Sequence, residues 1–516
     1  MTTSTSQSIR IANELGQLQT APGGPAQFSY WGKGKRALLI GLGPDPQSTL
    51  QCFLEHFAWK ASDAYEVFYL EAPGLEVMAG PAWKESIPGS WKRLDQEDLL
   101  SQDLSSFSLS FYKPGLRLFP SFYGPLRARI QATSFQASSN VQIAERTAII
   151  AGDDLGLLVS ELHDALSKSG FRTLQINHEA ISSNLPAIIQ KYKPELFVSI
   201  NLAGYDPLGE IYYLLNELGV TCASWLVDNP WHILSGLRSP YWKKMHLFVT
   251  DASFLPEMKA LGASSTHHLP LAANPELFRP RQANPAVDIV FAGRSEFPNR
   301  SKFFSAAKVD EELLAKAKEL TLSGQICDFN WWVNELAIKR LWPGQEVRKA
   351  GIGAETCSLT WRRACVRAAL QSKHSFKLYG NPEWLEQIPE LRGSLYPPQD
   401  YYTSLPSVYA DARIVLSTTS LLLPEGLNQR HFDAWMAGSI CMTDMTPGLE
   451  IFPPELVQPI AYSHPEEIQD KVKELLNNPD LQAKLKAQWS GLILSGHTYQ
   501  HRIQTMLAIM GIPPSA

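Results

Sequence analysis

The chain has 516 residues, of which 44% are hydrophobic and 19% are charged, and its formal net charge is −5. This length is more than one hydrophobic core usually organises, so we expect two to four domains. The mildly acidic balance gives no support for a nucleic-acid partner, which a strongly basic face would indicate. Because no apolar run is long enough to span a bilayer and the first residues lack a signal-peptide core, we expect a cytoplasmic protein without a transmembrane segment, with peripheral membrane contact left open.

The first part of the chain combines a polar arm with an α/β unit. Residues 1–29 are rich in Ser, Thr, Gln, Gly and Pro, which predicts a flexible arm. Residues 36–43 then form an apolar run that ends in glycine, and a helical pattern and a second apolar run ending near Glu71 follow. This order is that of a Rossmann start, so residues 30–145 are predicted to be an N-terminal Rossmann-like accessory domain.

The loop G-L-G-P-D-P of this unit lacks the third glycine of a dinucleotide fingerprint, and its prolines remove backbone donors. The sequence therefore favours a docking module here. The alternative, a methyltransferase-like module in which the glycine loop and Glu71 hold an adenosine cofactor, stays open.

Two further α/β series follow, separated by a proline-rich linker at residues 275–287. In each, short apolar runs alternate with helical patterns, which predicts a parallel, doubly wound sheet. We assign residues 146–282 to an acceptor-side domain, residues 283–490 to a donor-side domain, and residues 491–516 to a C-terminal helix that crosses back between them. Because ligands of such sheets bind at the carboxyl ends of the strands, the two domains are expected to face a shared cleft.

The segment P-E-G-L-N-Q-R-H-F-D-A-W-M-A-G, residues 424–438, combines groups suited to a diphosphate. Gly426 permits close backbone approach. The predicted helix start at Leu427 and Asn428 offers unpaired N–H groups, and Arg430 can give two parallel hydrogen bonds to phosphate oxygens. A plain amphipathic helix explains the apolar residues of this segment equally well.

This segment resembles the C-terminal domain of the CgeB-like group of GT-B glycosyltransferases, whose pattern is a glycine loop, an arginine, an aromatic–acid pair and A-G. The spacing from Glu425 to Asp433 is also similar to the E-x7-E signature of several GT-B families, with Asp in place of the second Glu. The resemblance implies that Glu425 lies near the donor sugar and acts in catalysis, and that Asp433 binds the ribose hydroxyls.

Other segments are similar to the same group. They imply donor-side roles for residues after three further strands: Gly293, Arg294 and Arg300, then Gly380, then Thr418. The tail G-H-T-Y-Q-H-R, residues 496–502, resembles the terminal motif of the group, where a bracing role is expected.

On the acceptor side, A-S-W-L-V-D-N-P-W-H resembles the matching domain of the group and places Asp228 at a strand end. An inverting transferase needs a carboxylate or histidine base near the acceptor hydroxyl, and Asp228 is the candidate. Asn229 and Asp251 are further cleft-facing candidates. Acids at strand ends also often cap the next helix, which is the alternative for Asp228.

The resemblance implies an α/β protein of GT-B fold, with two Rossmann-like doubly wound domains facing a cleft and an extra N-terminal α/β domain. It implies a hexosyltransferase-type glycosyltransferase with a UDP- or GDP-linked sugar as substrate and no cofactor. The acceptor would be a glycan, a lipid-linked saccharide or a protein such as flagellin. The six cysteines form no C-x-x-C pair and no D-x-D triad stands at a strand end, so no metal is expected. A nucleotide-sugar epimerase of the same fold and a catalytically degenerate scaffold remain alternatives.

Overall fold

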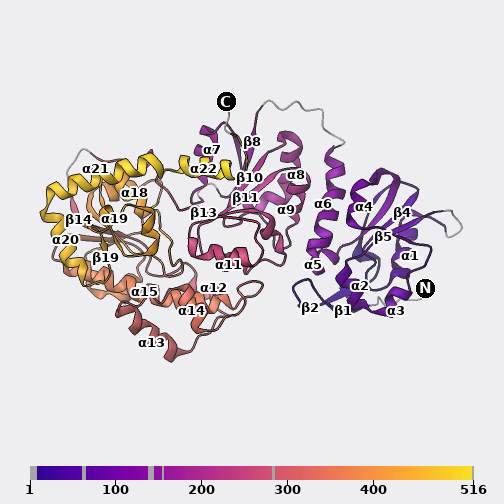
Figure 1. The fold of residues 1–516 in the computed structure, drawn as a ribbon, viewed down its shortest axis with the longest axis horizontal. Coiled ribbons are helices and arrows are strands. Elements are labelled where there is room, and N and C mark those ends of the chain that lie inside the picture. The colour runs from indigo at the N-terminus through magenta and orange to yellow at the C-terminus, as the bar shows by residue number, and fades with distance from the viewer. Residues whose placement is uncertain (1–7, 61–64, 137–144, 154–155, 282–284, 514–516) are drawn as a thin grey trace.

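Three α/β bodies lie in a row in the computed structural model of the chain (Figure 1). The structure describes residues 8–60, 65–136, 145–153, 156–281 and 285–513. An N-terminal domain lies at one end, a middle domain follows, and a carboxyl-terminal domain lies at the other end. The last helix of the chain returns from the carboxyl-terminal domain to the middle domain.

Residues 8–22 are part of the predicted flexible arm, but they form an ordered hairpin. Strands β1 (Ser8–Ala12) and β2 (Leu18–Pro22) pair antiparallel, and Ile11 and Ala21 are buried in the N-terminal core. The prediction is wrong here because two apolar side chains suffice to dock a polar segment, and composition does not show this. Residues 1–7 of the predicted arm lie outside the described residues.

The N-terminal domain is built on a five-stranded sheet of order β3-β7-β4-β5-β6, in which β3 alone is antiparallel to its neighbour. Its strands are β3 (Phe28–Gly32), β4 (Arg36–Ile40), β5 (Val67–Leu70), β6 (Lys92–Arg93) and β7 (Phe107–Tyr112). Its helices are α1 (Pro46–Phe57), α2 (Pro73–Ala79), α3 (Pro81–Glu85), α4 (Gln96–Ser101), α5 (Gly115–Leu118) and α6 (Pro120–Gln136). Helix α6 packs on α9 of the middle domain and so joins the two domains.

The middle domain has a six-stranded, fully parallel sheet of order β13-β12-β11-β10-β8-β9. Its strands are β8 (Thr147–Ala151), β9 (Arg172–Ile176), β10 (Leu196–Ile200), β11 (Thr221–Leu226), β12 (His246–Val249) and β13 (Ser265–His268). Its helices are α7 (Val159–Lys168), α8 (Ile181–Tyr192), α9 (Glu210–Glu217), α10 (Pro230–Leu234) and α11 (Leu255–Ala260). Runs such as L-F-V-S-I form these strands because both faces of a parallel sheet are covered by helices.

The carboxyl-terminal domain has a second parallel sheet, of order β16-β15-β14-β17-β18-β19, which is the Rossmann order. Its strands are β14 (Val287–Ala292), β15 (Phe376–Tyr379), β16 (Leu395–Tyr396), β17 (Ala412–Ser417), β18 (Ile440–Asp444) and β19 (Ala461–Tyr462). Its helices are α12 (Arg300–Phe303), α13 (Glu311–Leu322), α14 (Phe329–Glu335), α15 (Val347–Gln371), α16 (Trp384–Gln387), α17 (Leu405–Ala410), α18 (Arg430–Met436), α19 (Pro454–Val457) and α20 (Glu467–Asn477). The predicted GT-B architecture, with an added N-terminal α/β domain, is confirmed.

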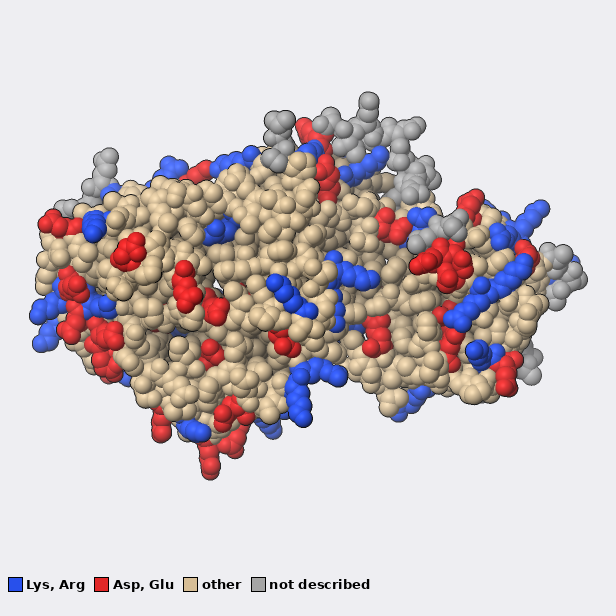
Figure 2. Space-filling view, in the orientation of Figure 1, with Lys and Arg blue, Asp and Glu red and all other residues tan. Residues whose placement is uncertain are grey.

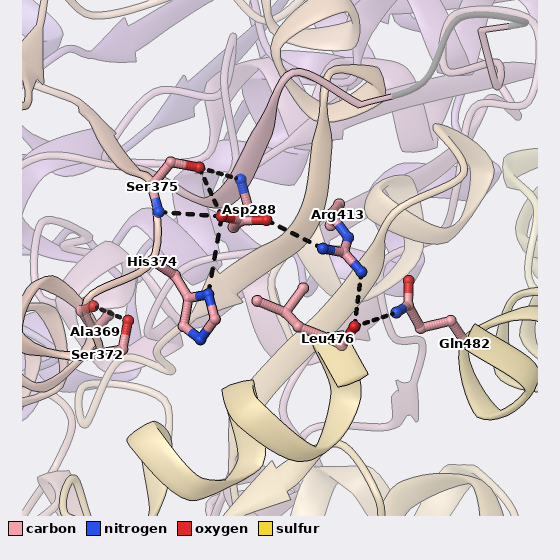
Figure 3. A network of polar contacts seen from close by, with 8 residues as sticks. All are labelled: Asp288, Ala369, Ser372, His374, Ser375, Arg413, Leu476 and Gln482. Carbon is pink, nitrogen blue, oxygen red and sulfur yellow. Dashed lines mark hydrogen bonds and ion pairs between the residues drawn. The ribbon is translucent and has the colours of Figure 1, made fainter. Parts of the chain in front are cut away.

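A polar network joins the amino-terminal ends of the strands in this sheet, where β14 and β17 begin (Figure 3). The carboxylate of Asp288 accepts hydrogen bonds from the backbone N–H and the hydroxyl of Ser375 and from Arg413, at 3.1, 2.9 and 3.2 Å. Arg413 also donates to the carbonyl of Leu476 at 2.8 Å. These contacts join β14, β15, β17 and α20, so we assign this network to stability.

The border between the two Rossmann-like domains in space does not coincide with the linker that separates them in sequence, because two helices that follow the linker pack into the core of the middle domain. Trp332 and Ala354, on α14 and α15 of the carboxyl-terminal domain, share one hydrophobic core with Trp242 and Phe254 of the middle domain. The tail helices α21 (Pro479–Gly496) and α22 (Tyr499–Ile509) run back so that α22 packs on α7. The two domains are therefore joined by packed helices as well as by the linker.

Candidate functional site

A cavity of about 390 Å³ lies between the middle and carboxyl-terminal domains, at the carboxyl ends of β11, β14 and β17. It is within the size range of small-molecule sites. The structure places these predicted residues in its wall: Asp228, Gly293, Arg294, Thr418, Gly426, Asn428 and Arg430. Groups from seven scattered sequence positions thus meet at the predicted edge of the sheets.

Arg430, at the start of α18, lies across the ends of two adjacent strands. Its guanidinium donates to the Ala292 carbonyl at 2.7 Å and to the Ser417 hydroxyl at 3.2 Å. The buried Nε has no hydrogen-bond partner among the described residues, and the group lies 5.4 Å from the Phe291 ring centroid. A cation fixed in this way, with donor capacity left over, is suited to an anionic ligand.

Two glycines of the cavity wall stand where a side chain would meet its neighbours. A Cβ on Gly293 would lie 3.5 Å from the guanidinium and 3.0 Å from the Phe291 ring, so a side chain there would crowd the group that the cavity presents. Gly426 is buried, and a Cβ on it would come within 2.7 Å of Leu423. The Oδ1 of Asn428 accepts a hydrogen bond from the backbone N–H of Arg430 at 3.0 Å. This N–H, one of the donors at the start of α18, is therefore already bound by a protein side chain.

Arg362 and Glu355, both on α15, also line the cavity. Arg362 belongs to a basic cluster with Arg363 and Arg367, a pattern typical of a solvated helix face, but the structure places Arg362 in the cavity wall. Its guanidinium donates to the carbonyls of Arg294 and Ser295 at 3.3 and 3.2 Å, and buried Glu355 accepts the N–H of Phe297 at 2.8 Å. Burial lowers the pKa of Arg362, Glu355 opposes that shift, and the charge of Arg430 adds to it. Two cations therefore lie close together in this wall.

The middle domain supplies the opposite wall through Asp228 and His232. Asp228 follows β11 and accepts a hydrogen bond from the Nδ2 of Asn201 at 2.7 Å. The side chain is partly exposed, yet the walls of the cavity desolvate its carboxylate and raise its pKa. His232 on α10 is buried beside Phe303 and Phe304, and burial lowers its pKa to about 4, so its ring is neutral. The sequence did not predict a role for His232. Its position four residues after Asp228, the predicted acid at a strand end, was the only sequence signal for it.

Five predicted site residues do not line the cavity. Asp433 is fully buried, and it accepts hydrogen bonds from the Tyr401 hydroxyl at 2.9 Å and from the backbone N–H of Asn274. This side chain is on the linker face of α18, so the structure contradicts a ribose contact in this arrangement. The other residues are placed as follows: Leu427 is in the hydrophobic core, Gly380 packs against Trp384 and the Gly293 carbonyl, Arg300 donates to Thr356, and Glu425 lies beside the cavity next to Gly426.

The middle domain holds the glycine loop of the carboxyl-terminal domain directly. Asn229 donates its Nδ2 to the Leu422 carbonyl at 2.9 Å, and Asp251 accepts the N–H of Glu425 at 2.9 Å. Both side chains are buried, Asn229 at 3% exposure and Asp251 at 0%. Desolvation is the main cause of the raised pKa of Glu425, and the negative charge of Asp251 is the next largest cause. The two cleft-facing candidates are therefore contacts across the domain border.

The glycine loop of the N-terminal domain faces the protein interior. Gly41 and Gly43 are buried, and a Cβ on Gly41 would come within 2.6 Å of Tyr112 and 3.0 Å of Tyr123. Glu71 is 1% exposed and accepts the N–H groups of Leu42 and Ala72, each at 2.8 Å, as well as the Tyr123 hydroxyl. The structure therefore contradicts the adenosine-cofactor alternative, because the acid and the loop are already occupied by protein groups.

Within the described residues, no group of three or more His, Cys, Asp or Glu side chains could hold a metal ion. No helix in the same part of the chain is long and apolar enough to cross a membrane.

Residues 362–508 match a family model described as glycosyl transferase-like. The matched part contains Arg362, Arg430 and the tail, and it excludes the middle domain. No curated protein sequence matches the chain. Together with the two facing Rossmann-like domains, the match supports a glycosyltransferase of the GT-B kind.

Three solved structures to which the chain is similar are distant from it in sequence. HepE of Anabaena in complex with UDP-glucose aligns at 8% identity and a TM-score of 0.45, over 71% of this chain and 99% of HepE. The T4 phage BGT in complex with UDP-glucose aligns at 9% and 0.39, over 71% and 99%. TarM aligns at 10% and 0.37, over 61% of this chain and 54% of TarM, about half of its length. Likenesses of this degree assign no role to individual residues.

Proposed function

We propose that this chain is a hexosyltransferase-type glycosyltransferase that binds a nucleotide-sugar donor in the cavity between its two Rossmann-like domains. The observation that carries the proposal is the pair of cations Arg430 and Arg362 in the cavity wall. Both arginines belong to the part of the chain that the family model matches. Gly293 and Gly426 line the same cavity. Guanidinium groups recognise phosphate oxygens through paired N–H donors. A diphosphate placed there relieves the repulsion between the two cations.

The same two cations account for leaving-group stabilisation without a metal ion. When the bond from the anomeric carbon to the diphosphate breaks, negative charge develops on the phosphate oxygens. Fixed donors aimed at such a position stabilise the transition state, because they need no reorganisation. We therefore propose a metal-independent reaction in which Arg430 and Arg362 hold the departing nucleoside diphosphate.

Asp228 on the opposite wall is the proposed base for the acceptor hydroxyl. Its raised pKa favours proton uptake, and the hydrogen bond from Asn201 orients its carboxylate. The motif at residues 424–438 and the tail at residues 496–502 support placing the chain in the CgeB-like group. A UDP- or GDP-linked sugar as donor and a glycan, lipid-linked saccharide or protein acceptor in the cytoplasm are part of this proposal.

Calorimetric titration with UDP, GDP, TDP and CMP tests the donor site. We expect one nucleoside diphosphate to bind, with an affinity that EDTA does not change and that Arg430→Ala lowers at least tenfold, since hydrogen bonds to charged groups contribute about 1.5–3 kcal/mol. Arg392→Ala, a change at an exposed arginine outside the cavity, should leave it unchanged.

Failure of all four nucleotides to bind would contradict the donor site and favour a scaffold protein. Binding without sugar transfer or donor hydrolysis would favour a catalytically degenerate protein. The placement of Asp433 away from the cavity gives that second outcome a structural basis.

A further inference from the structure

A second cavity, of about 260 Å³, lies where the N-terminal domain meets the middle domain. One wall comes from β3, β7 and the α5–α6 segment, and the other from Leu208 and Glu210 at the start of α9. None of these residues lines the donor cavity. The N-terminal domain therefore contributes a recess of its own, separate from its buried glycine loop.

The recess combines an exposed indole with basic side chains. Trp31 on the edge strand β3 is 38% exposed and packs edge-on against Phe111, with ring centroids 6.3 Å apart. Lys113 and Arg117 form no ion pair within the described part of the chain, and Arg117 donates only to the Thr20 carbonyl. Three basic residues with a single acid leave this recess cationic, in a protein whose net charge is −5.

Arg127 and Glu210 form an ion pair across the domain border, with the nitrogen and oxygen 2.6 Å apart. This pair fixes one side of the recess and neutralises one of its three cations. The uncompensated charge therefore comes from Lys113 and Arg117, which line the same recess as Trp31.

We propose that this recess binds an anionic saccharide, with a sugar ring stacked on Trp31 and its acidic group held by Lys113 and Arg117. The flat apolar face of an indole suits the C–H face of a pyranose ring, and it costs little side-chain entropy to order. A guanidinium and an ammonium together suit a carboxylate or a phosphate ester. Basic residues elsewhere on the visible face are interspersed with acids and do not form the stripe that nucleic acid requires (Figure 2).

One loop connects this recess to the cleft. The segment that follows β10 begins at Asn201, which holds Asp228 in the cleft, and it reaches Leu208 in the recess seven residues later. Both features lie at the carboxyl edge of the middle sheet. An extended acceptor can therefore lie over this loop with one end at Asp228, so the N-terminal domain would select acidic acceptors. This role rests on the proposed transferase function, whereas the binding itself does not.

Calorimetric titration of the full chain with trigalacturonic acid, at low ionic strength, tests the proposal. We expect measurable binding that weakens at least fivefold for Trp31→Ala and for Lys113→Glu, and that weakens with added salt. The fully methyl-esterified trisaccharide, which has the same shape without the charge, should bind at least fivefold less well. Lys308→Ala, a change at an exposed lysine of the carboxyl-terminal domain, serves as the matched control.

Titration of the same variants with the nucleotide that binds to the unmodified chain separates this proposal from the donor site. We expect Trp31→Ala and Lys113→Glu to bind that nucleotide as the unmodified chain does, which also shows that they are folded. No binding of the trisaccharide by the unmodified chain would overturn the saccharide site. Equal binding by Lys113→Glu and the unmodified chain would overturn it as well, and so would pyrophosphate bound as tightly as the trisaccharide. A glycerol phosphate trimer that binds better than the trisaccharide would identify the acidic group as a phosphate ester.

Discussion

The two neighbouring arginines of α15 have opposite surroundings, although both belong to one basic run in the sequence. Arg362 lies in the cavity wall and holds the loop carbonyls of Arg294 and Ser295, whereas Arg363 donates outside the cavity to Gln387 at 2.8 Å. One residue of rotation along a helix, about 100°, separates the two roles.

Replacement of Arg362 by alanine is therefore expected to weaken nucleoside diphosphate binding at least tenfold, because it removes both a cation and the support of the loop after β14. Arg363→Ala keeps the cavity intact and should change the affinity less than twofold. Titration calorimetry with the nucleotide that binds to the unmodified chain measures both values. Equal losses in the two variants would show that general surface charge, and not the cavity wall, attracts the nucleotide.

Buried Glu71 should make stability depend on pH. Burial raises its pKa to about 7, from an ordinary value of 4.5, and the hydrogen bonds from Tyr123, Leu42 and Ala72 oppose the shift. Between these two values the folded state retains a proton that the unfolded state has lost. The free energy of unfolding therefore falls as pH rises through this window, by about 3 kcal/mol for a shift of this size.

Urea unfolding at pH 5 and pH 8 measures this dependence. Glu71→Gln stays uncharged, so the difference between the two pH values should shrink, although the variant is less stable at both because one acceptor is lost. Glu14, whose pKa burial also raises to about 7, preserves part of the slope in the same direction. An unchanged difference in the variant would exclude Glu71 as its source.

Residue type and spacing predicted part of the site. They could not predict which way each side chain points in the fold. Arg430 was predicted because an arginine at a helix start after a glycine suits a phosphate and matches the motif of the resembling group, and Gly293 was predicted from that resemblance alone. Asp433 was misplaced because the spacing of the motif gives a helix position but does not say which face of α18 meets the linker. His232 gave almost no signal, since its place in the cavity depends on Phe303 and Phe304, about 70 residues later in the chain.

At the scale of elements, the glycine loop between β17 and α18 depends on another domain for its position. Asn229 and Asp251 bind its carbonyl and N–H groups with their side chains, each at 2.9 Å. A loop that receives a diphosphate must keep its backbone in place, because misplacement of binding groups costs affinity.

Asp251→Ala should therefore lower nucleotide affinity by about tenfold without removing any group from the cavity wall, since an unsatisfied buried N–H costs about 1–3 kcal/mol. Asp251→Asn keeps an oxygen acceptor for the Glu425 N–H and should recover most of the affinity. Nucleotide titration and a thermal melt of each variant distinguish this effect from unfolding. An alanine variant that melts normally and binds as the unmodified chain does would contradict a positioning role.

Most strands were predictable because short, continuous apolar runs between polar segments are typical of parallel sheets with both faces covered. The bounds of the helices between β14 and β15 could not be predicted from the sequence. Trp332 on α14 and Trp361 on α15 belong to different cores, so the apolar residues of this section do not follow a single helical stripe. Sequence periodicity cannot divide such a section among its neighbours.

At the scale of the whole molecule, the tail locks the two Rossmann-like domains together. Arg502 on α22 donates to the carbonyls of Pro270 and Leu271 in the middle domain, at 2.7 and 3.0 Å, and Thr498 bridges to Ala273. The guanidinium is 7% exposed, and burial lowers its pKa to about 10, so it remains charged at neutral pH.

Arg502→Ala is expected to lower the free energy of unfolding by about 2–4 kcal/mol, because buried carbonyls lose a charged donor. Urea unfolding at neutral pH gives the value, and Arg392→Ala, at an exposed arginine, should shift it by less than about 0.5 kcal/mol. A loss below 1 kcal/mol for Arg502→Ala would mean that apolar packing of α22 alone anchors the tail.

The core that α14 and α15 share with the middle domain also decides what can exist as a separate piece. If the chain were cut in the linker, residues 145–281 would keep all six strands of their sheet, yet Phe254 would lose its ring contact with Phe329 of α14, and Trp242 would lose its ring contact with Trp342. We expect such a fragment, with this apolar face uncovered, to aggregate or misfold. We therefore expect the two Rossmann-like domains to fold, and to be exchanged between proteins, as one unit, whereas the N-terminal domain has a core of its own and is the separable module.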